Sequence, residues 1–445
     1  MKYRLIPFAL LLSVLFAGCA KEESKQAAQI TASTQTTKAA TAPQSTTTAA
    51  TTEAAIAATE PPKPVHNEPP ADLLLLVDQT IEVYEVMTIS EMLCGFNGQL
   101  EQPDTLVDTN EIGTFETTIR YTFADELYEH PVSYTVKDTT PPLLLNSGYD
   151  AQITVGKEFR LTEHVGVADH YDRAPVLTSW GTVDTAVCGS YPVKAVAADA
   201  SGNSISWDLT VQVVEREHDT PKNAPQLSFD QLRERYAADN AHFGIDVSRW
   251  QANIDFNAVR DAGCEFVLMR MGYYYDTMKM DEYYRTNMEK ARAAGLDVGI
   301  YIYTTANTEE EVRSNAQWIA QQLDGQELDF PVIFDWESFS NFQKYGMSIH
   351  DLNMLFEVFA DEMAKHGYPV MLYGSRNLLQ EFWYPQTEHP VWLAHYTEET
   401  DYEGDYALWQ MTDRGSIAGI TGNVDFNILY ADRMEAFTND ETNRT

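Results

Sequence analysis

Positive charge and cysteine are both scarce in this 445-residue sequence. It contains 30 Lys and Arg residues against 67 Asp and Glu residues, which gives a formal net charge of −37. This balance argues against a nucleic-acid binder, because such proteins depend on cationic contacts to phosphate. It also provides no attraction to an anionic membrane surface. An acidic surface of this kind mainly indicates solubility and self-repulsion.

Cysteine is too rare and too scattered to predict a disulfide framework. Beyond the N-terminal segment only Cys94, Cys188 and Cys264 remain, an odd number in three different parts of the chain. We expect all three to be small, buried, apolar residues that neither form bridges nor bind metal.

The N-terminus has a short basic start and an apolar run, "MKYRLIPFALLLSVLFAGC". This pattern predicts a secretory signal peptide over residues 1–19, and the run is too short for a stable membrane span. Its end, "LFAGC", resembles the lipobox of bacterial lipoproteins, although Phe16 replaces the usual small aliphatic residue. The resemblance implies cleavage before Cys19 and lipidation of Cys19. The alternative is an ordinary signal peptide with a chance cysteine.

Residues 20–70 contain no Phe, Tyr or Trp and consist mostly of Ala, Thr, Ser, Gln and Pro. Such a segment cannot bury enough apolar surface to fold. We predict a disordered, flexible linker between a membrane anchor and the working domains.

An internal repeat follows, with units expected at residues 72–138 and 139–216. Each unit has Val-Asp-Thr and then a glycine two residues before an aromatic residue, Gly113 with Phe115 and Gly189 with Tyr191. Short alternating runs separated by turn residues predict β-sandwiches. The segment "DTTPPLLL…AADASGN" resembles the immunoglobulin-like repeats of bacterial surface proteins. The units contain no cluster of acids or histidines and no aromatic platform, so we expect them to act as spacers or weak adhesins. Catalysis should not need them. The alternative is that they bind a specific carbohydrate.

A polar linker is expected over residues 217–241, and from 242 to 436 strand-like runs alternate with amphipathic helices. One helix is predicted to begin at Thr308, which forms a capping box with Glu311. Another is predicted to follow Ser348 and to stop at Gly367. Alternating strands and helices over about 200 residues predict a (β/α) barrel of the TIM type.

In such a barrel the working side chains lie at the C-terminal ends of the strands. The run "PVIFDWES" ends in Asp335 and Glu337, which share one face of their strand. The ends of all the strand-like runs together supply Asp246, Arg270, Tyr301, Tyr303, Asp335, Glu337, Tyr373, Tyr396, Trp409 and Asp425.

Acids without histidine or cysteine partners fit zinc poorly, and neither a metal nor another cofactor is expected. A carboxyl pair suits cleavage of a glycosidic bond, and aromatic rings offer flat faces to sugars. Asp335 and Asp246 should raise the pKa of Glu337, because a nearby like charge disfavours ionisation. Taken singly, the features have simpler explanations: an Asp-x-Glu pair is usually an exposed or capping pair, and Asp425 could form an Asx turn.

The segments "FGIDVSRWQANIDFNAVRDAGCEFVLMRMGY", "PVIFDWES", "VWLAHYT" and "LWQMTDRGSIAGITGNVDFN" resemble glycoside hydrolase family 25, the muramidases. The resemblance covers about residues 242–433; Ala252 and Phe256 depart mildly from the family pattern. It implies an irregular, flattened barrel with fewer helices than strands. It also implies cleavage of the β-1,4 bond from N-acetylmuramic acid to N-acetylglucosamine in peptidoglycan.

Carried over by position, Glu337 is the implied general acid. Asp335 is the acid that orients or stabilises the N-acetyl group or acts as nucleophile, and Asp246 and Asp425 support them. The expected substrate-binding residues are Arg270, Tyr301, Tyr303, Tyr373, Trp392, Tyr396 and Trp409.

The sequence as a whole therefore predicts a multidomain muramidase that acts on peptidoglycan glycan strands. We expect it outside the cytoplasm, lipid-anchored to the bacterial membrane and facing the cell wall. The alternative is a non-catalytic, peptidoglycan-binding or adhesive surface lipoprotein.

Overall fold

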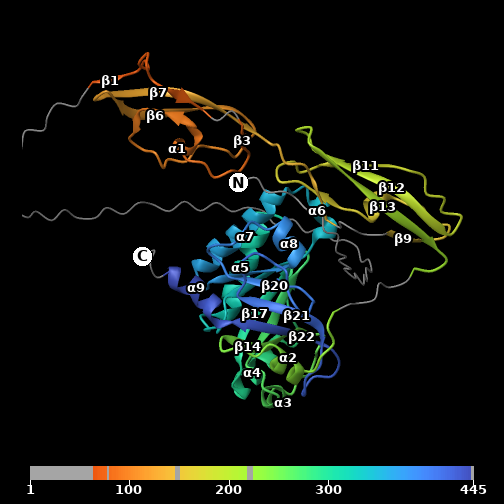
Figure 1. Cartoon of the computed structure of the whole chain (residues 1–445). Helices are drawn as coiled ribbons and strands as arrows, with labels where there is room; N and C mark the ends of the chain where they lie inside the picture. Colours follow the sequence, from red (N-terminus) through yellow and green to blue (C-terminus); the bar gives the residue numbers. More distant parts are fainter. Residues whose placement is uncertain (1–63, 78–79, 146–150, 218–223, 442–445) are drawn as a thin grey trace, which may run out of the picture.

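A computed structural model describes residues 64–77, 80–145, 151–217 and 224–441 (Figure 1). The expected signal peptide, Cys19 and nearly all of the expected disordered linker lie outside these residues. The described chain forms two β-rich units and a C-terminal barrel. Within it, no helix is long and apolar enough to cross a membrane.

The first β-rich unit is built around the hairpin of β6 and β7, in which alternate side chains are buried. Ile119 and Tyr121 of β6 and Val132, Tyr134 and Val136 of β7 form its core. Its elements are β1 (Val65–His66), β2 (Leu75–Leu76), β3 (Ile81–Glu82), α1 (Ile89–Met92), β4 (Gly95–Phe96), β5 (Gln99–Leu100), β6 (Gly113–Phe123) and β7 (Glu126–Lys137).

The second unit has the same plan around the hairpin of β12 and β13. Its elements are β8 (Leu143–Leu144), β9 (Ala151–Thr154), a 3₁₀ turn (Leu161–Glu163), β10 (Val167–Ala168), β11 (Val176–Trp180), β12 (Gly189–Ala198) and β13 (Ser204–Val214).

The internal repeat is visible in the strand pairing of the two units. In the first, β5 and β7 flank β6 as antiparallel neighbours and β3 joins β7 in parallel. In the second, β11 and β13 flank β12 and β9 joins β13 in parallel. The repeated glycines, Gly113 and Gly189, begin the matching strands β6 and β12. Each unit has one main sheet and a two-stranded ladder, β2 with β4 or β8 with β10, where a sandwich of two comparable sheets was expected.

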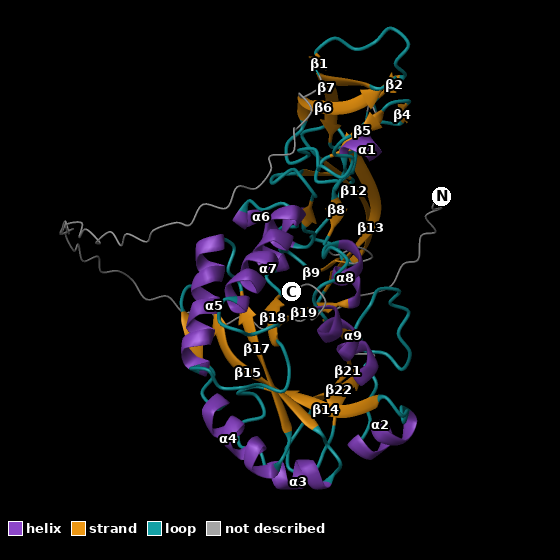
Figure 2. Ribbon diagram, turned by 90° about the vertical axis from the view of Figure 1, so that its left-hand side faces the viewer, coloured by secondary structure: helices purple, strands orange, loops and turns teal. Residues whose placement is uncertain are grey.

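The C-terminal part is a closed barrel of eight strands, as the sequence predicts (Figure 2). The strand order is β14-β22-β21-β20-β19-β18-β17-β15, and β14 pairs with β15 to close the ring. Only β22 runs antiparallel to its neighbours, while β16 forms a hairpin with β15. The strands are β14 (Ala241–Val247), β15 (Phe266–Tyr274), β16 (Met278–Met280), β17 (Asp297–Thr304), β18 (Val332–Trp336), β19 (Val370–Ser375), β20 (Val391–Ala394), β21 (Leu408–Gly415) and β22 (Val424–Tyr430).

Helices cover only part of the barrel, in agreement with the expected irregular fold. They are α3 (Phe256–Asp261), α4 (Tyr284–Ala294), α5 (Glu309–Leu323), α6 (Phe342–Tyr345), α7 (Ile349–Ala364), α8 (Arg376–Glu381) and α9 (Ala431–Glu441), with a 3₁₀ turn at Phe339–Asn341. No described helix lies between β20 and β21 or between β21 and β22. α7 begins with a capping box of Ser348 and Asp351. At α5 only half of the expected box forms, because Glu311 accepts from the backbone N–H of Asn307.

The expected linker over residues 217–241 differs from the structure. Its second half contains α2 (Phe229–Arg235), which begins with a capping box of Ser228 and Gln231. Leu227, Phe229 and Leu232 are buried in the barrel's main apolar cluster. The barrel unit therefore includes residues N-terminal to 242, because α2 covers apolar surface of the barrel.

The cysteine expectation is correct for one residue of the three. Cys264 is buried, whereas Cys94 and Cys188 are exposed, and all three are free thiols.

Candidate active site

The strands bring the candidate acids to one end of the barrel. Asp246, Asp335 and Glu337 lie at or just after the C-terminal ends of parallel strands. Asp425 differs from the expectation, because it lies at the beginning of the antiparallel β22.

Asp335, near the end of β18, lies beside Tyr303 of β17 and Tyr373 of β19 in the sheet register. Asp246 of β14 lies directly opposite Asp425 of β22. Strand closure therefore places acids that are far apart in the sequence at one mouth.

The two faces of β18 have the separate roles that alternation predicts. Phe334 faces outward, with its ring centroid 4.9 Å from that of Phe359 on α7. Ile333 belongs to the apolar layer inside the barrel. Asp335 shares the inner face with Ile333, so its carboxylate lies next to the apolar layer inside the barrel.

Asp335 is a buried acid with an unused acceptor. Only 6% of it is exposed, and its Oδ1 atom has no hydrogen-bond partner. Burial raises the pKa of Asp335 well above its usual range, the negative charge of Glu337 raises it further, and the Arg270 guanidinium opposes both. A buried acceptor without a partner is costly in a folded protein, so this oxygen is suited to receive a donor from a ligand.

Glu337 directly follows β18 and reaches solvent at the mouth. Protein atoms surrounding it remove part of its hydration, and the negative charge of Asp246 adds to this, which raises the pKa of Glu337 to about 7. Glu337 therefore combines an exposed position with protein groups close around its carboxyl. The direction agrees with the sequence-based expectation, but burial is a larger cause than the neighbouring charge.

Asp246 is held by a hydrogen-bond network that the sequence analysis did not include. Its Oδ2 atom accepts from Gln410 Nε2 at 2.9 Å and from Asn427 Nδ2 at 2.8 Å. Burial raises the pKa of Asp246 to about 6, and these two bonds partly offset the rise.

The network continues outward to aromatic side chains. The Tyr373 and Tyr396 hydroxyls both donate to Gln410 Oε1, at 2.9 and 3.1 Å. Trp392 Nε1 donates to Asn427 Oδ1 at 2.8 Å. Gln410 and Asn427 lie in the quoted segments "LWQMT" and "NVDFN", and strand alternation placed both on the inner face. That alternation was the available signal for finding them.

Asp425 is half-buried at the same mouth. Its negative charge contributes to raising the pKa of Tyr396 and of Tyr301, although burial is the largest cause for both tyrosines. All four predicted acids therefore act on one another or on shared neighbours.

Arg270 is not a free substrate ligand. Its Nε and Nη2 atoms donate to Asp281 Oδ2 at 2.9 and 2.7 Å, and the Asp281 side chain is 1% exposed. Asp281, which the sequence analysis missed, fixes the guanidinium of Arg270, whose charge favours the ionised form of Asp335.

The predicted aromatic residues divide into three groups. Tyr301, Tyr303, Tyr373 and Tyr396 surround the acids, and burial raises the pKa of each well above its usual value, so the hydroxyls stay neutral. Trp392 is 2% exposed and lies in the inner apolar layer, where it supports Tyr373 at a ring distance of 4.6 Å.

Trp409 is a correction to the predicted site. It belongs to the cluster outside the strands, and its ring packs edge-on against Tyr236 at 5.7 Å. Its neighbour Gln410 takes the inward position because adjacent strand residues face opposite sides.

Two exposed rings near the mouth were not among the predicted site residues. Trp250, just after β14, is 73% exposed, and the Arg249 guanidinium lies 4.7 Å from its ring centroid. Tyr275 is 60% exposed and lies 5.6 Å from Tyr303. Both offer open flat faces of the kind that sugar rings contact.

The described residues contain no group of three or more His, Cys, Asp or Glu side chains arranged to hold a metal ion. The chemistry available from the residues in place is proton transfer and electrostatic stabilisation by carboxyls within a ring of neutral phenols.

Comparison with known proteins agrees with this geometry. Residues 245–420 match glycosyl hydrolases family 25. The uncharacterized protein YegX of Escherichia coli O157:H7 is 30% identical over 207 residues, which cover 44% of this chain and 72% of that protein. The autolytic lysozyme of Clostridium acetobutylicum is 29% identical over 188 residues, 41% of this chain and 54% of the lysozyme. The chain thus spans about half the length of that lysozyme.

Among solved structures, the modular autolysin LytC from Streptococcus pneumoniae matches with 26% identity and a TM-score of 0.40, covering 53% of this chain and 56% of that one. The protein belongs to glycosyl hydrolases family 25. The family match includes Asp246, Asp335 and Glu337 and ends just before Asp425.

Proposed function

We propose that this protein is a muramidase that hydrolyses the β-1,4 bond between N-acetylmuramic acid and N-acetylglucosamine in peptidoglycan. The observation that carries the proposal is the trio of Asp246, Asp335 and Glu337, whose pKa values are all raised at one barrel mouth. Like charges this close cannot all ionise easily, so the site retains a proton near neutral pH.

Glu337 is the proton donor in this proposal. A carboxyl that titrates at about 7 is protonated in a large fraction of molecules at neutral pH and can give its proton to a leaving glycosidic oxygen. Its exposure at the mouth lets a glycan chain reach it.

Asp335 faces the sugar from inside the barrel. Its unpartnered Oδ1 atom is suited to accept the N–H of an N-acetyl group or to stabilise positive charge that develops at the anomeric carbon. The negative charge of Asp246 helps to raise the pKa of Glu337. The tyrosines provide neutral hydrogen-bond donors and ring faces for the substrate.

The decisive experiment is mass analysis of fragments that the full-length protein releases from purified peptidoglycan. The proposal predicts new reducing ends on N-acetylmuramic acid. New reducing ends on N-acetylglucosamine would assign a different bond, and binding without release would favour a non-catalytic glycan-binding protein.

The location of the protein is a separate proposal. The small residues before Cys19 and the linker after it support a lipid anchor at Cys19 that holds the barrel outside the cytoplasm near the wall. Detergent phase partition of wild type and Cys19→Ala tests this. Equal partition of both into the aqueous phase would exclude the anchor.

The shared strand order of the two β-rich units supports their proposed relation to immunoglobulin-like repeats.

A further inference from the structure

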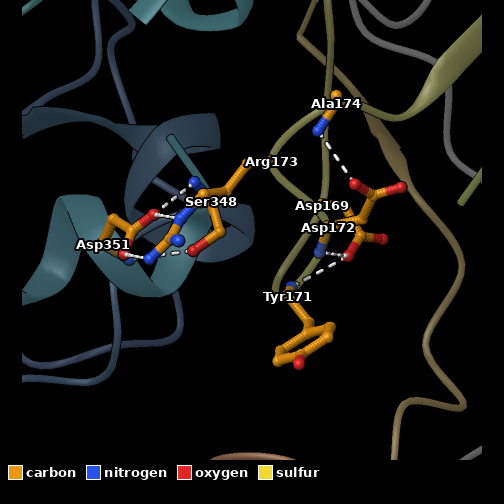
Figure 3. Close-up of polar contacts among 7 residues, drawn as sticks. All are labelled: Asp169, Tyr171, Asp172, Arg173, Ala174, Ser348 and Asp351. Carbon is orange, nitrogen blue, oxygen red and sulfur yellow. Dashed lines mark hydrogen bonds and ion pairs between the residues drawn. The ribbon is translucent and has the colours of Figure 1, made fainter. Parts of the chain in front are cut away.

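The second β-rich unit contacts the barrel next to the catalytic strand. In both views this unit lies beside α6 and the beginning of α7 (Figures 1 and 2). Ala168, Leu143 and Leu145 of this unit pack against the main apolar cluster of the barrel. The polar contacts are made by residues 169–175, which we call the docking loop. Figure 3 shows the loop facing Ser348 and Asp351.

A two-pronged ion pair joins the docking loop to α7. Arg173 donates from Nε to Asp351 Oδ2 at 2.7 Å and from Nη2 to Asp351 Oδ1 at 2.8 Å. Asp351 also accepts from the backbone N–H of Ser348 at 2.8 Å and so belongs to the cap of α7. Fork-to-fork geometry of this kind fixes orientation as well as distance.

The docking loop also caps α7 through its backbone. The Ile349 N–H donates to the Asp169 carbonyl at 2.7 Å, and the His350 N–H donates to the His170 carbonyl at 3.4 Å. The first N–H groups of a helix have no partner within the helix. Here another unit of the chain supplies those partners.

Hydrogen bonds within the docking loop stabilise its shape. Asp169 Oδ1 accepts from the backbone N–H groups of Tyr171 and Asp172, each at 2.8 Å. Asp172 Oδ1 accepts from the Ala174 N–H at 2.9 Å. These short-range bonds hold the turn that presents Arg173.

The first β-rich unit also contacts the beginning of α7. The Tyr84 ring stacks on the His350 ring with centroids 3.5 Å apart and planes 3° apart. On its other side, His350 Nδ1 lies 3.1 Å from the Tyr384 hydroxyl. Both β-rich units therefore contact the beginning of α7.

The segment that the docking loop contacts, α6 and the beginning of α7, follows Glu337 in the chain. The chain runs from Glu337 through α6 to α7, and Gln343 Nε2 in α6 donates to the Pro175 carbonyl at 3.4 Å. Phe342 of α6 packs edge-on against Trp336, one residue before Glu337, at 6.2 Å. Buried Ser338 shares a hydrogen bond of 2.8 Å with Tyr345. The connection after the catalytic strand is thus held at α6 and at α7 by a different unit.

We propose that the docking loop is a positioning element for the proton donor Glu337, with Arg173 as its principal positioning residue. This inference rests on the proposed function. It changes the role expected for the β-rich units from spacers to part of the catalytic framework. The physical reason is that a displacement of about 1 Å at a reacting group can lower the rate about 100-fold.

The test compares full-length Arg173→Ala with Arg160→Ala on purified peptidoglycan. Arg160 lies in the same unit and pairs only with nearby Glu158 and Glu163, at an exposure close to that of Arg173. Arg173→Ala should lower kcat about 10- to 100-fold with KM changed less than about threefold. Arg173→Lys should restore part of the loss, because it keeps the charge but not the fork. Arg160→Ala should behave as wild type.

A pH profile separates positioning from plain stability. A partly exposed ion pair contributes little to global stability, so the melting temperature of Arg173→Ala should stay near that of wild type. If the protein atoms around Glu337 pack less closely in Arg173→Ala, its carboxyl gains hydration and its pKa falls toward the ordinary value. The alkaline limb of the kcat profile should then move to lower pH. The charged and titratable groups near Glu337 that stay unchanged in this variant are Asp246, Asp335, Arg270, Tyr303, Tyr373 and Tyr396.

Tyr84→Asn provides a second, independent variant. Asn tolerates the left-handed backbone at this position, where φ is 65°, and removes the ring that stacks on His350. It should lower kcat and move the alkaline limb in the same direction. Wild-type kcat and pH profile in both folded variants would overturn the inference, and if Arg173→Ala fails to fold, Tyr84→Asn alone decides. Failure of the wild-type protein itself to cleave peptidoglycan would instead reject the proposed function, and this inference with it.

Discussion

Gln410 and Asp246 are 164 residues apart in the chain, yet Gln410 Nε2 donates to Asp246 Oδ2 at 2.9 Å inside the barrel. This bond favours the ionised form of Asp246, and Gln410 also accepts from Tyr373 and Tyr396. One amide therefore links an acid of the first barrel strand to two tyrosines of the substrate mouth.

Gln410→Met should raise the pKa of Asp246 above about 6, because a hydrogen bond to the carboxylate is lost. If ionised Asp246 supports turnover, the acid limb of the kcat profile should move to higher pH. Turnover against pH measures this, with Gln317→Met as control, since Gln317 bonds only Glu362 outside the barrel. An unmoved acid limb would contradict the role given to Gln410.

Asp246→Asn should move the alkaline limb of the kcat profile to lower pH. Burial is the larger cause of the raised pKa of Glu337, which is about 7, and the negative charge of Asp246 adds to it. Removing that charge should therefore lower the pKa of Glu337 part of the way toward its ordinary value. The donor then loses its proton at lower pH, and the alkaline limb should move to lower pH. The control is Asp261→Asn, which removes an equal charge from an exposed site. Identical alkaline limbs in both variants would disprove the coupling.

Glu337→Gln should keep the shape of the site but remove its transferable proton. General acid catalysis contributes roughly 100- to 10,000-fold, so turnover should fall by about that factor while glycan binding persists. Product release and binding to insoluble peptidoglycan are measured side by side, with the exposed Glu327→Gln as control. Near wild-type turnover would remove Glu337 as the donor.

Arg270→Met should destabilise the fold by leaving the buried Asp281 carboxylate without its cation. Breaking a buried pair costs about 3–5 kcal/mol, measurable as a lower urea midpoint. The double variant Arg270→Met with Asp281→Asn should recover part of that loss, because no unpaired charge remains. A single variant as stable as wild type would show that the pair is not structural.

Asp169→Asn should make the protein more stable at neutral pH. Burial raises the pKa of Asp169 from 3.8 to about 6, so the unfolded chain ionises first. The contribution of this residue to stability is therefore full below pH 3.8 and is lost as the pH rises to about 6. Asn keeps the acceptor for Tyr171 and Asp172 and avoids the buried charge. Above pH 6 the gain should be below about 3 kcal/mol, the limit set by 1.36 kcal/mol for each pKa unit before solvent screening, and it should become small near pH 4. Equal melting curves at pH 7 would refute this.

Much of the barrel could be predicted from the sequence because its signals are local. The spacing of Val312, Ala316 and Ile319 in the sequence puts them on one side of α5, and all three are buried in the structure. The period of two placed Phe334 and Asp335 on opposite faces of β18.

Asp246, Asp335 and Glu337 could be assigned to one mouth because parallel strands end on the same side of a barrel. Asp425 reaches that mouth from the beginning of the antiparallel β22, which only the structure shows.

Tertiary structure alone decided the features that depend on distant partners. Trp409 was assigned to the mouth from its motif, and the structure shows its ring outside the barrel against Tyr236. The sequence could not show that α2 completes the core, or that Arg173 meets Asp351 across 178 residues. Local propensity fixes which segments become strands and helices. Closure of the barrel and docking of the β-rich units decide which side chains meet, because those contacts form only between surfaces that folding brings together.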